Sequence, residues 1–255
     1  MIAVNEDLLW VAKDVDDIEK LKLPSILDET VVRQLRLFKK TDLEVLNVIS
    51  TFDSSVSLEV ISDILNIDQV KLKDIINEFV SAKIINEKLE DWGYTYDFYK
   101  IQIKAYVYNS MEINKRSSYH NVASDVLEEY YKKEDRDNKD EIIHHLRKCG
   151  KLSRAIDYCL EAANKMLDLN IYAQALEFYD VAVQLLDQHK DIKRNNDILL
   201  TMGKIYAQIG QNDKAVETYQ QIIRSGSEKG YYKSVIDSKN KLADIYILKN
   251  MLPES

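Results

Sequence analysis

Residues 203–219 read GKIYAQIGQNDKAVETY. Gly203 and Ala215 are small residues on two predicted helices, and Gly210 stands where the first helix would end. Small residues on facing helices let two antiparallel helices approach closely, and Tyr219 would fill the space beside them. The stretch therefore predicts a hairpin of two packed helices.

Partial copies of this hairpin flank it on both sides, which indicates a repeated unit. The distance from Gly210 to Asn250 is 40 residues, longer than the common tetratricopeptide repeat. We expect a tetratricopeptide-like α-solenoid over residues 140–255 whose last copy supplies only its first helix, so that the repeat region is truncated at its C-terminus. The residues expected at repeat-packing positions are Gly150, Ala155, Ala175, Tyr179, Gly203, Tyr206, Gly210, Ala215, Tyr219 and Tyr246.

Residues 40–111 predict a second compact domain. The segment Thr41–Glu44 has the spacing of a capping box that opens a first helix, and a second helix is expected near Ser57. Asp68 is placed to cap a third helix. Apolar and polar residues then alternate on both sides of a turn between Ile85 and Phe98, which predicts a β-hairpin. Three helices followed by a hairpin is the order of a winged helix-turn-helix.

The predicted fold class is mainly α: a winged helix-turn-helix with a small β-hairpin, followed by a tetratricopeptide-like α-solenoid. The chain has only 6 Gly and 2 Pro among 255 residues, which favours helices joined by short polar connections. The expected divisions are a connector and first helix (1–39), a winged-helix-like domain (40–111), a helical linker (112–139) and helical repeats (140–255).

The order of these parts resembles the arm region of the signal-transducing ATPases with numerous domains, the STAND class. Residues 98–108 read FYKIQIKAYVY and resemble the signature Phe-x-His-Asp-x-Ile-Arg-x-Ala-Val-Tyr of that class, with Lys100 and Ile101 where the class has His and Asp. The stretch from Trp10 to Pro24 is similar to its tryptophan-containing connector. The resemblance implies a regulatory arm, and the chain has no GxxxxGK[ST] loop of its own.

No group of residues predicts catalysis, a metal site or a cofactor site. His144 and His145 are adjacent on a predicted helix and would point about 100° apart, so they could not jointly hold one metal ion, and His120 stands alone in the sequence. Cys149 and Cys159 fit neither a redox nor a zinc spacing. We therefore expect a protein that is not an enzyme, with no catalytic, cofactor-binding or metal-binding residues and no cofactor.

The charge balance disfavours nucleic acid as a partner. The chain carries 35 basic and 43 acidic residues, a net charge of -8. Residues 40–104 hold seven basic and twelve acidic residues, and the would-be recognition helix, residues 68–82, contains no Arg. No uninterrupted apolar run approaches the length of a membrane span. These features favour a cytoplasmic protein without a membrane segment.

The leading hypothesis is a non-catalytic sensor or autoinhibitory arm of a larger STAND signalling ATPase or transcriptional regulator. Its partners would be a protein or peptide in the repeat groove, or the nucleotide-binding module of the same protein, and the expected groove residues are Tyr172, Tyr206 and Tyr246. An alternative is a transcriptional regulator whose winged helix binds DNA and whose repeats mediate oligomerisation. A homodimer through the C-terminal helix, Val235 to Lys249, is a further alternative.

Overall fold

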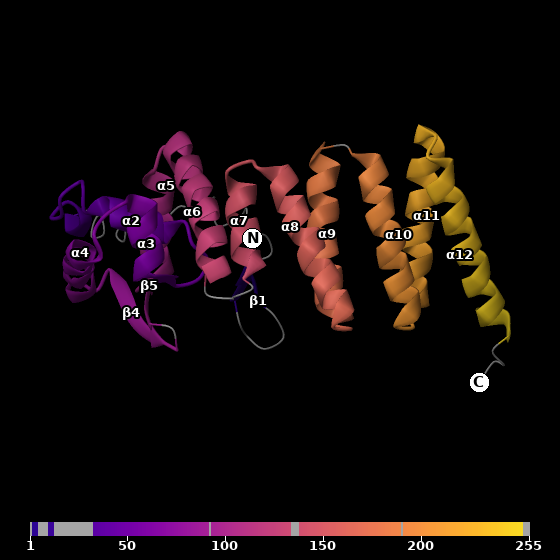
Figure 1. The fold of residues 1–255 in the computed structure, drawn as a ribbon, viewed down its shortest axis with the longest axis horizontal. Coiled ribbons are helices and arrows are strands. Elements are labelled where there is room, and N and C mark those ends of the chain that lie inside the picture. Colours follow the sequence, from indigo (N-terminus) through magenta and orange to yellow (C-terminus); the bar gives the residue numbers. More distant parts are fainter. Residues whose placement is uncertain are drawn as a thin grey trace. The chain divides into compact units, whose positions relative to one another are not determined.

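The computed structural model describes residues 2–4, 10–12, 33–91, 93–133, 138–189 and 191–251 (Figure 1). The chain divides into two compact units, residues 1–150 (unit 1) and residues 151–255 (unit 2). The start of the first helix expected within residues 1–39 lies outside the described residues. The four-part division expected from the sequence stays a prediction.

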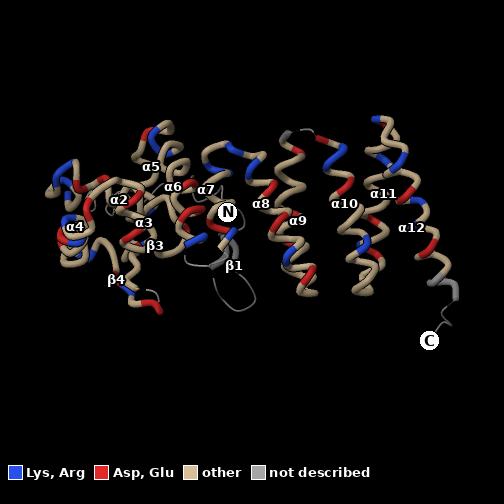
Figure 2. The backbone as a smooth tube through the Cα atoms, viewed as in Figure 1, with Lys and Arg blue, Asp and Glu red and all other residues tan. Residues whose placement is uncertain are grey.

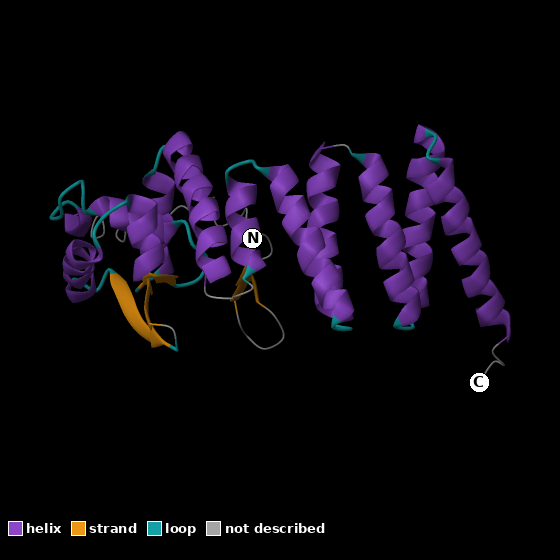
Figure 3. Cartoon of the chain, viewed as in Figure 1, coloured by secondary structure: helices purple, strands orange, loops and turns teal. Residues whose placement is uncertain are grey.

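Unit 1 combines helices with two small sheets (Figure 3). Its described elements are β1 (Ile2–Val4), β2 (Trp10–Ala12), α2 (Leu43–Ser50), β3 (Val56–Ser57), α3 (Leu58–Leu65), α4 (Gln69–Ser81), β4 (Ile85–Glu90), β5 (Gly93–Phe98), α5 (Ile101–Ser110), α6 (Ile113–Lys133) and α7 (Lys139–Lys148). Strands β1 and β2 pair antiparallel with each other.

The predicted hairpin is confirmed as β4 and β5, which pair antiparallel with Ile85 opposite Phe98. A third strand, β3, was not expected from the sequence because it is two residues long, too short for an alternating pattern. It pairs with β5 and gives the sheet order β3-β5-β4. Apolar side chains of α2, α3 and α4, such as Leu46, Ile61 and Phe79, form the core beside this sheet.

Two of the predicted helix starts are confirmed. The side chain of Ser57 accepts a hydrogen bond from the backbone N–H of Val60 at the start of α3. The carboxylate of Asp68 accepts from the backbone N–H groups of Val70 and Lys71 at the start of α4. These contacts satisfy backbone donors that the first turn of a helix leaves without partners.

The predicted capping box at the start of α2 is wrong. The hydroxyl of Thr41 donates to the Asp42 carboxylate at 3.1 Å, and the first turn of α2 has no side-chain cap. Glu44 instead accepts a hydrogen bond from Lys115 at 2.6 Å and another from Tyr119, both on α6. A charged partner on another helix has therefore replaced the local contact that the spacing predicted.

Unit 2 contains α8 (Leu152–Asp168), α9 (Tyr172–His189), α10 (Ile192–Gln208), α11 (Asn212–Lys229) and α12 (Tyr232–Met251), which lie side by side (Figure 1). Each of these helices begins 20 residues after the one before it. Helix α8 packs on α9, α10 packs on α11, and α12 packs on α11. Two helices with their turns therefore make a repeat of 40 residues, the spacing that the sequence indicated.

The turns of unit 2 repeat one backbone conformation. Asn170, Gly210 and Gly230 all have a positive φ, between 58° and 80°. After Asn170, the backbone N–H of Ile171 donates to the carbonyl of Met166 at 2.8 Å, which closes a Schellman motif. The same motif recurs after Gly210 and Gly230. A regular turn gives each helix the same exit geometry and so supports a regular stack.

The ring of Tyr219 lies directly over Gly203, where α11 crosses α10. A Cβ atom added to Gly203 would lie 2.5 Å from Cε1 of Tyr219, too close for an undisturbed fit. Tyr219 and Ala215 are both fully buried, so the ring has no open space into which it could move. The absence of a side chain at Gly203 is therefore a packing requirement.

Replacing Gly203 with Ala should destabilise the folded chain by about 1–3 kcal/mol, because the new methyl group overpacks the α10–α11 contact. At an open helical position the same change would stabilise the helix. Urea unfolding followed by circular dichroism measures the effect. In a background of Tyr219→Leu, which removes the ring, the cost of Gly203→Ala should shrink; equal costs in both backgrounds would contradict the steric explanation.

Candidate functional site

The structure places nine of the ten expected repeat-packing residues in three kinds of environment. Fully or nearly fully buried positions between helices are Ala155, Ala175, Tyr179, Gly203, Ala215 and Tyr219. Gly150 and Gly210 lie in turns, where an added Cβ atom would contact nothing within 4 Å. These two glycines therefore serve the turns by adopting a positive φ, and they do not serve close packing. Tyr206 is half-buried.

Tyr246 differs from its expected packing position, since 47% of its surface is exposed. Helix α12 packs on α11 through its other face, where Val235, Ser238 and Ile245 are buried. The exposed face of α12 also carries Ile247, 53% exposed. Nothing described in the structure covers this face, and its expected role in a homodimer stays a prediction.

Two of the three expected groove tyrosines lie on neighbouring helices. The side chain of Gln208 on α10 donates to the hydroxyl of Tyr172 on α9 at 2.8 Å. The ammonium of Lys214 on α11 lies 5.6 Å from the ring centre of Tyr206, a cation–π contact. Burial, and secondarily the nearby Asp180 carboxylate, raise the pKa of Tyr206. The α9–α11 surface, defined by these five residues, therefore presents two half-buried aromatic rings among polar groups.

Helix α4 corresponds to the helix that the winged-helix prediction would assign to DNA reading. The ammonium of Lys73 is held within unit 1 by the Glu87 carboxylate and by the hydroxyl of Tyr96, at 2.8 Å from the latter. The same ammonium lies 4.7 Å from the ring centre of Tyr94. Helix α4 has two basic residues, Lys71 and Lys73, and Lys73 is engaged by β4 and β5.

Three histidines meet in unit 1, a cluster that the sequence did not predict. Nδ1 of His120 on α6 lies 2.9 Å from Nδ1 of His145 on α7, and the ring of His144 lies 5.5 Å from that of His120. His120 was expected to stand alone, and this expectation is wrong because the packing of α6 on α7 brings the rings together. The hydroxyl of Tyr108 on α5 lies 3.0 Å from Nε2 of His120.

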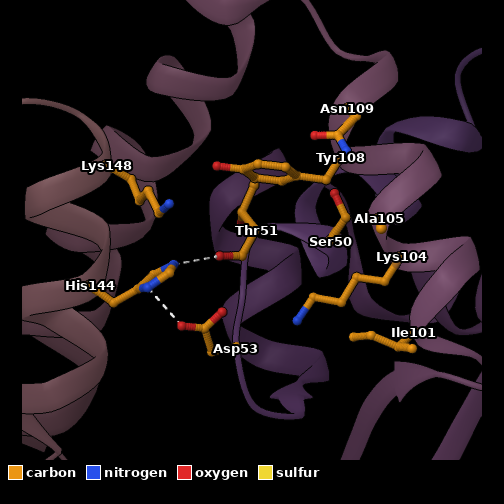
Figure 4. A pocket seen from close by; sticks show the side chains of 10 residues that line it. All are labelled: Ser50, Thr51, Asp53, Ile101, Lys104, Ala105, Tyr108, Asn109, His144 and Lys148. Atoms are coloured by element: carbon orange, nitrogen blue, oxygen red, sulfur yellow. Dashed lines mark hydrogen bonds and ion pairs between the residues drawn. The ribbon is translucent and has the colours of Figure 1, made fainter. Parts of the chain in front are cut away.

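His144 has an acceptor at each ring nitrogen (Figure 4). Its Nδ1 lies 2.7 Å from Oδ2 of Asp53, and its Nε2 lies 3.2 Å from the backbone carbonyl of Thr51. The hydrogen bond from His144 lowers the pKa of the Asp53 carboxyl, so Asp53 is ionised at neutral pH. The Asp53 carboxylate and the Thr51 carbonyl are both acceptors, so both ring nitrogens of His144 lie against groups of the protein itself.

The other two histidines are neutral. Burial, with the charge of His144 as a smaller cause, lowers the pKa of His120 to about 3. Burial also lowers the pKa of His145 well below its ordinary value. One ring of this pair therefore donates the Nδ1–Nδ1 hydrogen bond and the other accepts it. Nε2 of His145 is buried with no hydrogen-bond partner in the described parts of the chain, and the ring of Phe52 packs against this histidine.

The described histidines of unit 1 bond with one another and with neighbouring groups of the protein. A general base needs a ring nitrogen directed at its substrate, and both ring nitrogens of His144 are engaged by protein acceptors. Across the described residues, no group of three or more His, Cys, Asp or Glu side chains is arranged to hold a metal ion. None of the described helices is long and apolar enough to span a membrane.

The stacked helices of unit 2 define a tetratricopeptide-like class of helical-repeat folds, which serve protein interaction. Residues 96–238, more than half of the chain, match the protein family described as SNAP, soluble NSF attachment protein. The chain belongs to this family. No curated relative matches the sequence.

Among solved structures, the chain is similar to a signal transduction ATPase with numerous domains from Pyrococcus horikoshii, which carries a tetratricopeptide repeat sensor. The two sequences are 12% identical, and the TM-score is 0.29. The match covers 93% of this chain and 50% of the other, so this chain spans half the length of that protein.

Acid should destabilise the chain through the neutral histidine pair. In the unfolded chain a histidine takes up a proton near pH 6.5, whereas folded His120 does so only near pH 3. Because the unfolded state binds more protons between these values, the stabilisation is complete above about pH 6.5 and is lost as the pH falls toward 3. For His120 the loss at pH 5 is about 2 kcal/mol. Urea titrations at pH 7.5 and pH 5 measure it.

The matched variant is His120→Asn, whose amide cannot titrate but can still bond with Nδ1 of His145. Its difference in unfolding free energy between the two pH values should be smaller than that of the unmodified chain by about 2 kcal/mol. An unchanged difference would show that the buried histidines do not cause the acid sensitivity.

Proposed function

We propose that this chain is a non-catalytic protein-interaction module whose unit 2 binds an extended segment of a partner protein across the α9–α11 surface. The observation that carries the proposal is the half-buried ring of Tyr206, held beside Lys214 and Asp180. A ring restrained by its neighbours loses little conformational freedom when a ligand stacks on it, so binding costs less entropy. Gln208 and the hydroxyl of Tyr172 add polar groups that can bond with a peptide backbone.

The charge of unit 2 supports recognition by shape and hydrogen bonding over attraction by charge. Residues 151–255 contain 14 basic and 14 acidic residues, so the net charge of -8 belongs to residues 1–150. Figure 2 shows both signs interspersed along α8–α12. A surface without a dominant sign does not steer a charged partner from a distance. Affinity would instead come from the aromatic anchors and their polar neighbours.

A finer proposal is that the module acts as a regulatory arm of a larger STAND-type ATPase or regulator. The resemblance of residues 98–108 to the signature of that class supports it, together with the absence of a phosphate-binding loop from the sequence. In this arrangement unit 2 would receive the partner, and unit 1 would pack on a nucleotide-binding module. The elements of unit 1 follow the order of a winged helix, which supports this assignment of roles.

Selection of displayed peptides on the pure chain should yield sequences that bind at the α9–α11 surface. For the best of them, Tyr206→Ala should weaken binding at least about tenfold in fluorescence anisotropy, because it removes the central aromatic anchor. Raising the salt concentration from 50 to 500 mM should change the affinity less than about threefold, since unit 2 carries no net charge.

The matched control is Tyr232→Ala, which removes a tyrosine that is 69% exposed on α12 of the same unit. It should leave the affinity nearly unchanged. Equal losses in the two variants, or no peptide whose binding depends on Tyr206, would refute the proposed surface.

The pure chain should not hydrolyse ATP in the presence of magnesium, because no phosphate-binding loop occurs in the sequence. Release of inorganic phosphate, followed with a coupled assay, tests this. Hydrolysis that needs a divalent metal and persists through further purification would refute a non-catalytic module.

A further inference from the structure

Unit 1 contains a large pocket that the proposed protein-interaction role does not use. Its volume is about 610 Å³, within the range of pockets that bind small organic molecules. The lining comes from residues 52–60, from strands β4 and β5, and from helices α6 and α7 with the residue that precedes α7. All of these belong to unit 1, so the pocket is complete within that unit.

One face of the three-stranded sheet forms part of this pocket. Thr95 on β5 stands opposite Ser57 on β3 and opposite Lys88 on β4. Residues directly opposite each other in an antiparallel pair point to the same face, as do residues two apart on one strand. Ser57, Thr95 and Glu90 therefore share one face, and all three line the pocket.

Two polar side chains on this face lack hydrogen-bond partners. Thr95 is 3% exposed, and its Oγ1 makes no hydrogen bond with any residue that the structure describes. The carboxylate of half-buried Glu90 likewise makes no hydrogen bond or ion pair within the described parts of the chain. Buried polar groups almost always have a partner, so a ligand that donates hydrogen bonds would supply what this face lacks.

A second carboxylate lines the pocket from α7. Glu141 accepts hydrogen bonds from Ser54 at 2.8 Å, from Tyr131 at 2.7 Å and from Asn138 at 3.3 Å. Burial is the main cause that raises the pKa of the Tyr131 hydroxyl, and Glu141 adds to it, so this hydroxyl stays protonated and donates. Since all three partners are neutral, they orient the Glu141 carboxylate without neutralising its charge.

The described residues that line the pocket include no Lys, Arg or His. Two lysines outside the lining interact electrostatically with its two carboxylates, Lys88 with the one on β4 and Lys104 with the one on α7. Lys88 also forms an ion pair with Asp97 at 2.6 Å. Lys104 donates to a backbone carbonyl and interacts with Asp53 and Asp97 as well. An anion in the pocket would therefore meet two carboxylates and none of the described cations in the lining.

The side of the pocket formed by α6 is apolar and aromatic. The rings of Tyr130 and Tyr131 lie 5.7 Å apart with their planes inclined at 63°, and Leu127 lies one helical turn earlier. Aromatic rings attract organic cations through their π electrons. A cationic group carried on an apolar body would thus use both the acidic and the aromatic parts of the lining.

We propose that this pocket binds a primary ammonium group on an apolar body, with the ammonium against Glu90 and Thr95 and the body against Leu127 and Tyr130. An ammonium donates three hydrogen bonds and accepts none, which matches a pocket whose unpartnered groups can accept. A free organic amine and a lysine side chain of a partner share this chemistry. The site lies in unit 1 and does not depend on the proposed peptide binding by unit 2.

Isothermal titration of the full chain at pH 7.5 and low salt tests the proposal with tryptamine, tryptophol and indole-3-acetate. These probes carry the same indole ring and end in an ammonium, a hydroxyl and a carboxylate; the amine is protonated because an alkyl ammonium has a pKa of about 10. Tryptamine should bind at least about tenfold more tightly than tryptophol, since its hydrogen bonds are charge-assisted, and indole-3-acetate should bind most weakly.

A fourth probe, Nα-acetyl-lysinamide, distinguishes the two sources of the ammonium. It presents the group on the four-carbon stem of a lysine side chain. Tighter binding of this probe than of tryptamine identifies a lysine of a partner protein as the ligand. Tighter binding of tryptamine identifies a free amine with a larger apolar body.

Glu90→Gln should weaken binding of the tighter ammonium probe at least about tenfold, because it removes a charge that has no hydrogen-bonded partner among the described residues. Glu129→Gln is the matched control, since it removes the same charge from an exposed position on α6 that does not line the pocket. Its effect should stay below about twofold, because solvent screens a charge outside the site.

Thr95→Val separates a role in binding from a role in folding. The change removes the unpartnered hydroxyl and nearly keeps the shape of the side chain. It should weaken binding of the ammonium probe at least about threefold without lowering the free energy of unfolding in urea, since no described hydrogen bond is lost. A loss of stability with unchanged affinity would show that the hydroxyl serves the fold and would contradict its proposed contact with the ligand.

The proposal is overturned if neither ammonium probe binds at millimolar concentration, or if tryptophol or indole-3-acetate binds as tightly as tryptamine. Equal losses of affinity in Glu90→Gln and Glu129→Gln would also overturn it, because they would indicate nonspecific attraction to an acidic unit. Circular dichroism of each variant verifies that it folds.

Discussion

Close approach of neighbouring helices at small residues is the constraint on which unit 2 depends. Gly203 admits the ring of Tyr219, and Gly226 admits Val235, whose Cγ2 atom would lie 2.7 Å from an added Cβ. Ala175 is fully buried in the same way between helices. Side chains this small let neighbouring helices approach closely, and from α8 to α12 a new helix begins every 20 residues.

Local patterns in the sequence were sufficient to predict most of the fold. The repeat period was visible because Gly210 stops one helix and small residues recur at fixed distances from it. The β4–β5 hairpin was visible because its apolar residues alternate. The capping box predicted at Thr41 does not form, because Glu44 bonds with Lys115 instead. Lys115 is 71 residues away from Glu44 in the sequence, and no local rule predicts such a competing contact.

The candidate sites were less accessible from the sequence. Tyr172 and Tyr206 were expected as groove residues from their repeat positions, but their polar partners come from other helices and could not be predicted. The histidine cluster joins His120 with two residues of α7, and such a contact depends on how α6 packs on α7. A single sequence records no such pairing. Two features of the sequence could have drawn attention to these residues: the chain has four histidines among 255 residues, and two of the four are adjacent.

The low pKa of His120 joins the stability of unit 1 to the packing of α6 on α7. Burial between these helices is its main cause, and the electrostatic effects of His144 and Lys148 on α7 add to it. Protonation of His120 is therefore costly in the folded state, whereas the unfolded chain takes up a proton near pH 6.5. The same packing that holds α6 on α7 thus makes the folded unit lose stability as the pH falls.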